Sequence, residues 1–540
     1  MLREPHGSDR AEEPCCRMTV GIWLFTLLTT FVSGGVGVVA NTGGPLATRG
    51  PSVAGVTPAD GADQVAVGMA IKAIFKSDMD PATLSAATFR VGGRADPVSG
   101  IVSYDASSRT ATFTPLAPLL PLASYTVALT TGVKDRSGQP LTESYSWTFM
   151  TAPDALARPA SDVIPPTLFG MHVLRGATTA PWPAVGFKTW RLYANRVGWA
   201  DLEPRKGEWH FEKLDRYVSL ARQHSVEILL TLGQTPAWAA ARPNEASAWG
   251  AGHASAPKEM AEWKTYVRTV ATRYKGRIRA YEIWNEPNLK EFFTGSPDQL
   301  VDMAREAHAI LKDTDPANAV VSPAITRAYG IPWLERYLAK GGGAYADVIG
   351  YHFYVTPEPP EGMIEVINAV KKVMARNGIA RKPLWNTETG WAKGKTFASD
   401  AEAAAYVART YILSWAAGVD RLYWYHWDDH TWVSLWLTDQ DSLTLKPAAI
   451  AYDEMSKWLT GARMTSCGRN VTGAWVVHII RGDASRGWIV WSPDKPTTFV
   501  VPREWDAKQL KDLAGNRIRI ASAGRIEVGT APVLVESRAE

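Results

Sequence analysis

The sequence of 540 residues has few cysteines and no long run of basic residues. Cys15 and Cys16 precede an apolar block, and Cys467 is the only cysteine after it. This leaves no cysteine pair for an intrachain disulfide beyond that block, and no Cys/His spacing typical of zinc sites is present. Lys and Arg (58) nearly balance Asp and Glu (54), so the formal charge is only +4. We therefore expect neither a nucleic-acid partner nor a metal or other cofactor.

The N-terminal segment has the features of an export signal. Residues 18–48 carry no charge, and residues 20–32 are strongly apolar. The small residues at 38–40 would suit cleavage before Asn41. Extended to residue 39, the apolar part is also just long enough to span a bilayer, so residues 18–40 could instead be an uncleaved anchor. Both alternatives predict an extracytoplasmic protein, either secreted, periplasmic or anchored to the outer face of the inner membrane.

Residues 51–151 consist of short alternating runs, such as residues 125–129 and 147–149, separated by turn sequences. This pattern predicts a β-sandwich. The order of the runs at 56–58, 75–81, 112–115 and 147–149 resembles that of bacterial Ig-like domains of surface and secreted proteins. The resemblance implies a spacer, so we expect a protein that begins near Ser161 to keep its activity.

A proline-rich linker, residues 152–166, leads into a region in which short buried strands alternate with amphipathic helices. The apolar spacing of Met363, Ile367, Val370 and Met374 is typical of such a helix, with Asn377 and Gly378 at its end. Eight βα units within residues 167–460 predict a (β/α)₈ TIM barrel, a fold of about 250 residues. Residues 461–540 return to strand patterns and predict a small C-terminal β-sandwich. The expected strands of the barrel centre on residues 169–171, 190–192, 228–230, 281–283, 320–322, 349–351, 384–386 and 422–424.

Two glutamates stand where barrel strands end. Glu286 closes the fourth predicted strand and Glu388 closes the seventh. Barrel active sites form at these carboxyl ends, and three βα units separate the two glutamates, which places them across the mouth. Cleavage of a glycosidic bond needs such a pair, one carboxyl to protonate the leaving oxygen and one to face the anomeric carbon. Glu282 lies deeper along the fourth strand, so we expect it to be a buried partner of Arg279 or of a neighbouring strand.

These segments resemble the retaining glycoside hydrolases of the large β/α-barrel clan. The pattern is most similar to family 39, which holds β-xylosidases, α-iduronidases and bacterial exopolysaccharide hydrolases. The resemblance is carried by residues 169–170, 199–204 with 207–209, 233–238 and 281–288. It implies double displacement on a polysaccharide or oligosaccharide, with Glu286 as acid/base and Glu388 as nucleophile. A bacterial exopolysaccharide is the preferred substrate class, because an exported protein with a tethering sandwich suits work at the cell envelope.

Four further polar residues are candidates for substrate binding. In the motif of the clan, Asn285 would bond the 2-hydroxyl of the sugar. Arg191 on the second strand would hold Glu388 ionised by charge pairing. His352 and Tyr354 close the sixth strand, and one of them is expected to contact the nucleophile or the substrate. The sequence does not distinguish between these two.

Many of the 23 tryptophans lie near strand ends, where their rings could stack on the apolar faces of sugars. Trp238 after the third strand and Trp427 after the eighth are the predicted stacking platforms. Trp284 and Trp385 lie within strands and are expected in the core.

Two other functions are consistent with parts of the sequence. One is a non-catalytic carbohydrate-binding surface protein built on a glycosidase barrel, although the presence of both glutamates argues against it. The other is a metal-dependent barrel hydrolase. His172, His352 and His426 lie on different predicted strands with no evident carboxylate partner, which argues against a metal site.

Overall fold

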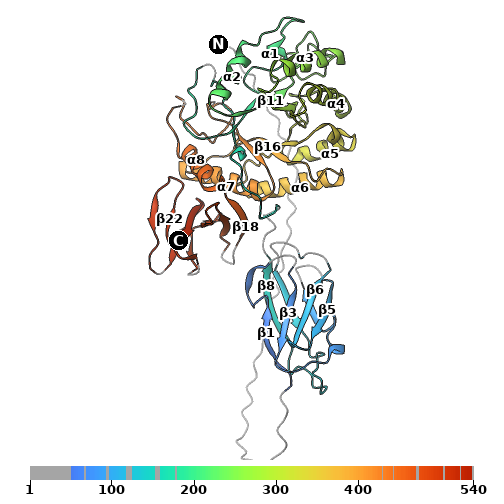
Figure 1. Ribbon diagram of the computed structural model, residues 1–540, viewed down its shortest axis with the longest axis vertical. Coiled ribbons are helices and arrows are strands. Elements are labelled where there is room, and N and C mark those ends of the chain that lie inside the picture. The colour runs from blue at the N-terminus through green and yellow to red at the C-terminus, as the bar shows by residue number, and fades with distance from the viewer. Residues whose placement is uncertain are drawn as a thin grey trace, which may run out of the picture. The chain divides into compact units, whose positions relative to one another are not determined.

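The computed structural model describes residues 50–537 except 66–68, 93–96, 117–118, 120–123, 152–157, 177–178, 429, 442, 470–472, 503–504 and 523. The predicted signal or anchor therefore lies outside the described residues. Within the described part, no helix is long and apolar enough to cross a membrane. Figure 1 shows three sets of elements in chain order, namely a first group of strands, a helix-rich barrel and a last group of strands.

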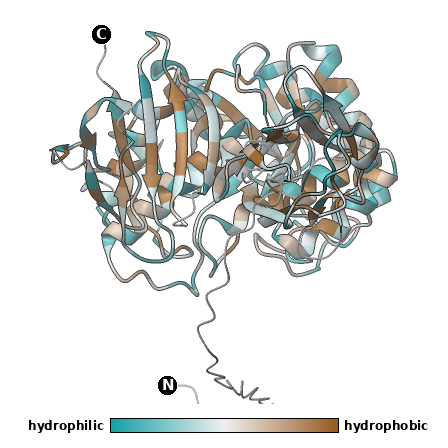
Figure 2. Cartoon of the chain, turned by 90° about the horizontal axis from the view of Figure 1, so that it is seen from below, coloured by the Kyte–Doolittle hydropathy of each residue, from teal (hydrophilic) through white to brown (hydrophobic). Residues whose placement is uncertain are grey.

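The first set is a sandwich of two four-stranded sheets, with strand orders β1-β3-β6-β5 and β2-β8-β7-β4. Ile71, Ala73 and Phe75 point into the core while Lys72 and Ile74 between them are exposed. Figure 2 shows that strands of the protein carry both hydrophilic and hydrophobic residues along their length. The sandwich has a hydrophobic core of its own. Its strands are β1 (Val53–Thr57), β2 (Ala62–Val65), β3 (Ile71–Phe75), β4 (Phe89–Gly92), β5 (Gly100–Asp105), β6 (Thr110–Pro115), β7 (Ser124–Leu129) and β8 (Tyr145–Thr151).

The second set is a parallel barrel whose strands include all eight predicted positions. Pro323 splits the fifth strand into β13 and β14, so the sheet contains nine segments. Parallel bridges from Val321 to Val348 and from Asn285 to Ala324 link these two segments to their neighbours. The segments are β9 (Phe169–Met171), β10 (Thr189–Leu192), β11 (Glu227–Leu232), β12 (Ala280–Ile283), β13 (Ala319–Val321), β14 (Ile325–Thr326), β15 (Ile349–His352), β16 (Leu384–Thr389) and β17 (Arg421–Trp424).

Helices follow every barrel strand except the first, whose connection to β10 contains no described helix. The predicted helix with apolar residues at 363, 367, 370 and 374 is α6, which buries all four and ends at Asn377, before Gly378 with its φ of 73°. The helices are α1 (Trp199–Leu202), α2 (Glu212–Gln223), α3 (Met260–Arg273), α4 (Pro297–Thr314), α5 (Ile331–Ala339), α6 (Gly362–Arg376), α7 (Asp400–Ala416) and α8 (Pro447–Leu459).

The third set shares the hydrophobic core of the barrel. Trp475 and Trp491 stack on each other and belong to the same cluster as the barrel helices. The indole N–H of Trp491 also donates to Glu361 beside α6 (2.9 Å). The strands are β18 (Arg463–Arg469), β19 (Trp475–Ile480), β20 (Arg486–Trp491), β22 (Ala507–Lys511), β23 (Arg517–Arg519) and β25 (Val533–Ser537) in one sheet, with β21 (Thr497–Val500) and β24 (Arg525–Val528) in another.

The second half of the predicted linker is attached to the barrel. Arg158 lies 3.5 Å over the ring of Trp415 and donates to the carbonyl oxygens of Trp415 (2.9 Å) and Val419 (3.2 Å). Ile164 is fully buried in the barrel core. The independent part of the chain therefore begins at Arg158, three residues before the start suggested by the sequence.

A protein shortened to begin at Arg158 is expected to fold and to keep its kcat on a small glycoside, because the first sandwich has a separate core. A protein that begins at Ser161 lacks the Arg158 contacts and should be about 1–2 kcal/mol less stable. Thermal unfolding and turnover of the two shortened proteins check this. Loss of kcat in a folded protein that begins at Arg158 would mean that the sandwich contributes to the site.

Candidate active site

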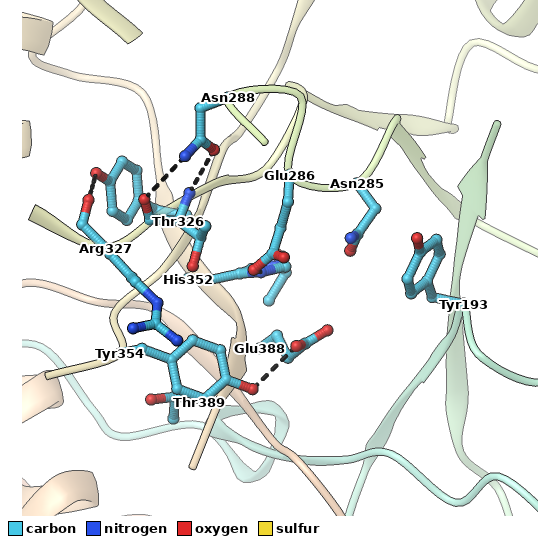
Figure 3. Close-up of polar contacts among 12 residues, drawn as sticks. Tyr193, Asn285, Glu286, Asn288, Thr326, Arg327, His352, Tyr354, Glu388 and Thr389 are labelled. Carbon is cyan, nitrogen blue, oxygen red and sulfur yellow. Dashed lines mark hydrogen bonds and ion pairs between the residues drawn. The ribbon is translucent and has the colours of Figure 1, made fainter. Parts of the chain in front are cut away.

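The two predicted catalytic glutamates face each other at the carboxyl ends of the barrel strands (Figure 3). Glu286 follows β12 and Glu388 lies in β16, and the two residues are only 8% and 6% exposed. An oxygen of each carboxylate and a ring nitrogen of His352 all lie within 4.8 Å of one another. The barrel therefore brings together two carboxyls that are about a hundred residues apart in the sequence.

Arg191 on β10 connects the residues below this pair. Its fully buried guanidinium donates to Glu388 Oε2 (2.7 Å), to Asn285 Oδ1 (2.7 Å) and to Glu282 Oε2 (2.9 and 2.5 Å). Glu282 also accepts from the hydroxyl of Thr231 on β11 (2.8 Å). One cation thus pairs with two buried carboxylates, and its geometry fixes the direction of the Asn285 amide.

The structure identifies the ion-pair partner of Glu282, which the sequence left open. Among the described residues its ion pair is with Arg191 on β10, and Arg279 takes no part. Glu282 is fully buried, at the depth expected from its place within the strand.

Glu388 receives one hydrogen bond on each oxygen. The hydroxyl of Tyr354 donates to Oε1 (2.9 Å), as drawn in Figure 3, and Arg191 donates to Oε2. Burial raises the pKa of Glu388 above its usual value, while His352 and Arg191 oppose this shift. The predicted contact with Arg191 is present, but it offsets the effect of burial only in part.

Glu286 contacts the other candidate of the sixth strand, since its Oε1 lies 2.8 Å from Nδ1 of His352. Burial raises the pKa of Glu286 to about 7. Burial also lowers the pKa of His352 to about 4, so the imidazole is neutral at neutral pH. His352 and Tyr354 therefore divide between the two carboxyls, with the histidine on Glu286 and the tyrosine on Glu388.

The backbone that carries Glu286 is strained and braced. Trp284 and Glu286 have φ angles of 79° and 43°, in the left-handed region that costs about 1–3 kcal/mol for such residues. The amide of Glu286 donates to the carbonyl of Ala324 (2.8 Å). Asn288 brackets the backbone of Thr326, accepting from its N–H (3.0 Å) and donating to its carbonyl (3.3 Å). These contacts hold Glu286 over the barrel mouth.

His352 has a carboxylate partner, which corrects one argument made against a metal site. Glu286, His352 and Glu388 offer three ligand atoms close enough for a cation. However, each oxygen of Glu388 already accepts a hydrogen bond, and one of these comes from a guanidinium at 2.7 Å. A metal ion would have to compete with the positive charge of Arg191.

Trp238 belongs to a cluster of hydrogen-bonded residues around Glu203. Its indole N–H donates to the carbonyl of Glu203 (2.9 Å), and its ring meets Trp199 edge to face. The carboxylate of Glu203 accepts from the indole of Trp199 (2.9 Å) and the amide of Gly207 (2.8 Å). These contacts explain the motif at residues 199–209, and they give Trp238 a packing role in place of the predicted stacking role.

The second predicted platform is wrong, because Trp427 is 1% exposed and lies in the barrel core. The aromatic side chains beside the carboxyls are others. Trp432 is 42% exposed and meets Tyr354 and Tyr425 edge to face, with ring centroids 5.4 and 5.6 Å apart. Strand alternation does not extend past Trp424, where β17 ends, and so it could not distinguish Trp427 from Tyr425.

Two site residues were not anticipated from the sequence. Tyr193 follows β10, stands opposite Asn285 in Figure 3 and lies 5.2 Å below the guanidinium of Arg191. Arg327 follows β14 with a φ of 60°, and its charge acts to lower the pKa of Glu286. Both positions come directly after barrel strands, and this is the signal by which they could have been found.

A parallel (β/α)₈ barrel with two buried, facing carboxyls at its mouth has the architecture of a barrel glycosidase. Comparisons with known proteins agree with this class. Residues 47–151 match the family described as bacterial Ig-like domain, and residues 183–421 match glycosyl hydrolases family 39. The chain is thus similar to a bacterial Ig-like domain in its first part and to glycosyl hydrolases family 39 over most of the barrel.

Individual relatives are more distant. A β-xylosidase of Geobacillus stearothermophilus is 24% identical over 233 residues, which are 38% of this chain and 46% of that protein. A β-xylosidase of Caldicellulosiruptor saccharolyticus is 31% identical over 146 residues, 24% of this chain and 30% of that protein. The chain therefore spans less than half the length of these curated relatives.

Solved structures share the fold. A family 39 glycoside hydrolase from Bacteroides cellulosilyticus superposes with a TM-score of 0.56 at 19% identity, covering 90% of this chain and 100% of that one. A family 39 β-xylosidase from Caulobacter crescentus gives a TM-score of 0.54 at 15% identity, covering 71% of this chain and 98% of that one.

Proposed function

We propose that this protein is a retaining O-glycoside hydrolase. The observation that carries the proposal is the approach of Glu286 and Glu388 to within 4.8 Å between carboxylate oxygens. Retaining enzymes hold their two carboxyls about 5–5.5 Å apart, whereas inverting enzymes need about 6.5–9.5 Å to admit a water molecule. The match to family 39 over the barrel supports the same reaction.

In the first step Glu388 attacks the anomeric carbon and Glu286 protonates the leaving oxygen. Tyr354 and Arg191 fix both oxygens of Glu388, so the carboxylate is oriented before the substrate arrives. The raised pKa of Glu286 keeps a proton available near neutral pH, and its origin is burial. The oxygen of the Asn285 amide is held by Arg191, which leaves its N–H₂ end to donate to a sugar hydroxyl.

In the second step Glu286, now ionised, takes a proton from water, and the water attacks the glycosyl ester on Glu388. His352 faces Glu286 through Nδ1 in both steps. Because its pKa is lowered to about 4, the ring stays neutral and can accept from the acid form or donate to the base form of Glu286, according to its tautomer.

The proposed substrate is a polysaccharide or oligosaccharide, and a bacterial exopolysaccharide is the preferred class. The named relatives are β-xylosidases, which supports an O-glycosidic bond and leaves the sugar to experiment. We also propose that the protein acts outside the cytoplasm, on the strength of the apolar block at residues 20–32. A non-catalytic carbohydrate-binding protein remains the alternative to be tested.

The proposal is tested by labelling. A 2-fluoro sugar with an activated leaving group should form a stable ester with Glu388, which peptide mass spectrometry would locate. A panel of glycans with and without a chelator distinguishes the alternatives, since a retaining glycosidase of this kind should be insensitive to the chelator and a binding protein should release no product. Labelling of another residue, or products of inverted configuration by NMR, would overturn the mechanism.

The pH dependence should report the proton on Glu286. Its folded-state pKa of about 7 lies above the usual 4.5, so kcat/KM should fall as the pH rises through about 7. Because of the same shift, Glu286 makes its full contribution to the free energy of unfolding below pH 4.5. That contribution is lost as the pH rises through 7. Glu286→Gln should therefore gain stability over the unaltered protein at pH 8, on the order of 3 kcal/mol, and gain none at pH 4.5. Denaturant titrations at the two pH values check this, and an equal effect at both would contradict it.

A further inference from the structure

A cavity of about 590 Å³ opens on the same face of the barrel as the two glutamates. It lies between the segment after β9, the segment after β10, the start of α2 and the segment after β17. Three of its lining residues are the cations Arg175, Arg196 and Lys213, and among the described residues of the lining the one carboxylate is that of Asp428.

The carboxylate of Asp428 is already engaged by backbone groups. Its two oxygens accept from the amides of Leu174 and Arg175, each at 2.7 Å, and the side chain is buried. The side chain of Arg175 donates to the carbonyl oxygen of Asp428. Asp428 therefore orders the segment after β9 and is not free to neutralise the other cations of the cavity.

Arg196 and Lys213 form no ion pair with any carboxylate in the described parts of the chain. Arg196 is exposed and has a φ of 58°, while Lys213 is half-buried. Burial lowers the pKa of Lys213, with Arg196 and Arg216 adding to the shift and Asp201 opposing it. Cations that share a cavity without a carboxylate in an ion pair repel one another, and an anionic ligand would relieve that repulsion.

A chain of contacts connects this cavity to the catalytic residues. Tyr193 stands opposite Asn285 (Figure 3), and its hydroxyl accepts from the indole N–H of Trp249 (2.7 Å). The guanidinium of Arg196 lies 5.3 Å from the ring of Trp249. Trp249 is half-buried and, with Tyr193 and Asn285, lines a small pocket. Along this chain of contacts, Arg191 donates to Glu388 and lies over Tyr193. Tyr193 and Trp249 lead from there to Arg196.

We propose that this cavity is a subsite for an anionic group, a carboxylate or a sulfate ester, on a sugar unit of the substrate beyond the one that is cleaved. The proposal rests on the glycosidase function and narrows its substrate class to acidic glycans. Trp249 offers apolar surface to a sugar unit in between, and Arg196 and Lys213 bind the charge.

The experiment measures binding by calorimetry to short glycans that differ in charge. The neutral probes are xylo-oligosaccharides and cello-oligosaccharides. The acidic probes are xylo-oligosaccharides with glucuronic acid branches, cello-oligosaccharides carboxylated at C6, and cello-oligosaccharides sulfated at C6. Acidic probes should bind at least about tenfold more tightly than their neutral counterparts at low salt, and added NaCl should reduce the difference. Comparison of the carboxylated with the sulfated probes shows which of these two anionic groups the subsite binds.

The double variant Arg196→Gln/Lys213→Gln should bind the acidic probes about tenfold more weakly and the neutral probes as before. Arg222→Gln, an exposed cation near the other end of α2, is the matched control and should leave both affinities unchanged. Equal binding of neutral and acidic probes, no binding of either, or an unchanged double variant would overturn the subsite. Equally tight binding of a DNA oligonucleotide would instead indicate a general polyanion surface. Hydrolysis of an activated aryl glycoside by the unaltered protein, measured separately, shows whether the glycosidase function itself has failed.

Discussion

Glu388→Ala should abolish formation of the covalent intermediate with every substrate and lower kcat at least about 10⁴-fold, because it removes the carboxylate proposed to attack the anomeric carbon. Tyr354 and Arg191 are positioned to orient that carboxylate and cannot replace it. Burst kinetics with an activated aryl glycoside measure the loss.

Glu286→Ala should fail in a different way. With a good leaving group the first step needs no proton, so the burst should persist while the second step becomes slow. Added azide fits the space left by the side chain and should restore turnover, giving the β-azide if the substrate is a β-glycoside. Glu454→Ala is the matched control, since Glu454 is a buried glutamate that contacts Lys457 and Lys511 far from the mouth. If Glu286→Ala shows no burst, or azide gives the inverted product from it, the roles assigned to the two glutamates are wrong.

Several strands were predictable because they contain a short apolar run, as at residues 228–230 in β11. The division of the fifth strand was not, because a proline in a buried run does not show whether the strand ends or only loses one bond. The sequence also did not predict that the connection after β9 contains no described helix, because the length of that connection is ordinary for a βα unit.

Glu286 and Glu388 were predicted from their places at strand ends and from the resemblance, and Arg191 and Asn285 were predicted beside them. The assignment of His352 and Tyr354 to one carboxyl each was not predicted. His352 ends β15 and Tyr354 follows two residues later, so strand periodicity would put both on one face and cannot assign them to different carboxyls. Their separation depends on the packing of β15 between β14 and β16. Trp249 and Arg196 lie outside the strands, where contacts depend on loop conformation, and nothing in the sequence pattern links them to Tyr193.

Replacement of Arg191 should have the largest effect on stability. Arg191→Met leaves Glu282 and Glu388 buried without a cation, which costs about 3–5 kcal/mol for a buried pair that loses one partner. Arg191 opposes the effect of burial on Glu388, so without the guanidinium the pKa of Glu388 should rise further. A carboxyl whose folded pKa is raised loses its contribution to stability as the pH rises through that value. The deficit should therefore be small near pH 4.5 and complete at pH 8, as measured by denaturant unfolding.

Two further variants distinguish the loss of the Arg191 charge from the loss of its packing as the cause of the lower stability. Arg409 on α7 is equally buried but pairs with Glu361, which also accepts from Trp491, so Arg409→Met should show a weaker pH dependence. Adding Glu282→Gln to Arg191→Met removes one of the two unpaired carboxyls and should recover part of the stability at pH 8. It should not recover activity, because Glu388 still lacks its cation and the acid limb of kcat/KM should stay shifted to higher pH. A loss of stability that is the same at pH 4.5 and pH 8 would mean that Arg191 acts through packing, and its role in setting the charge of the nucleophile would have to be abandoned.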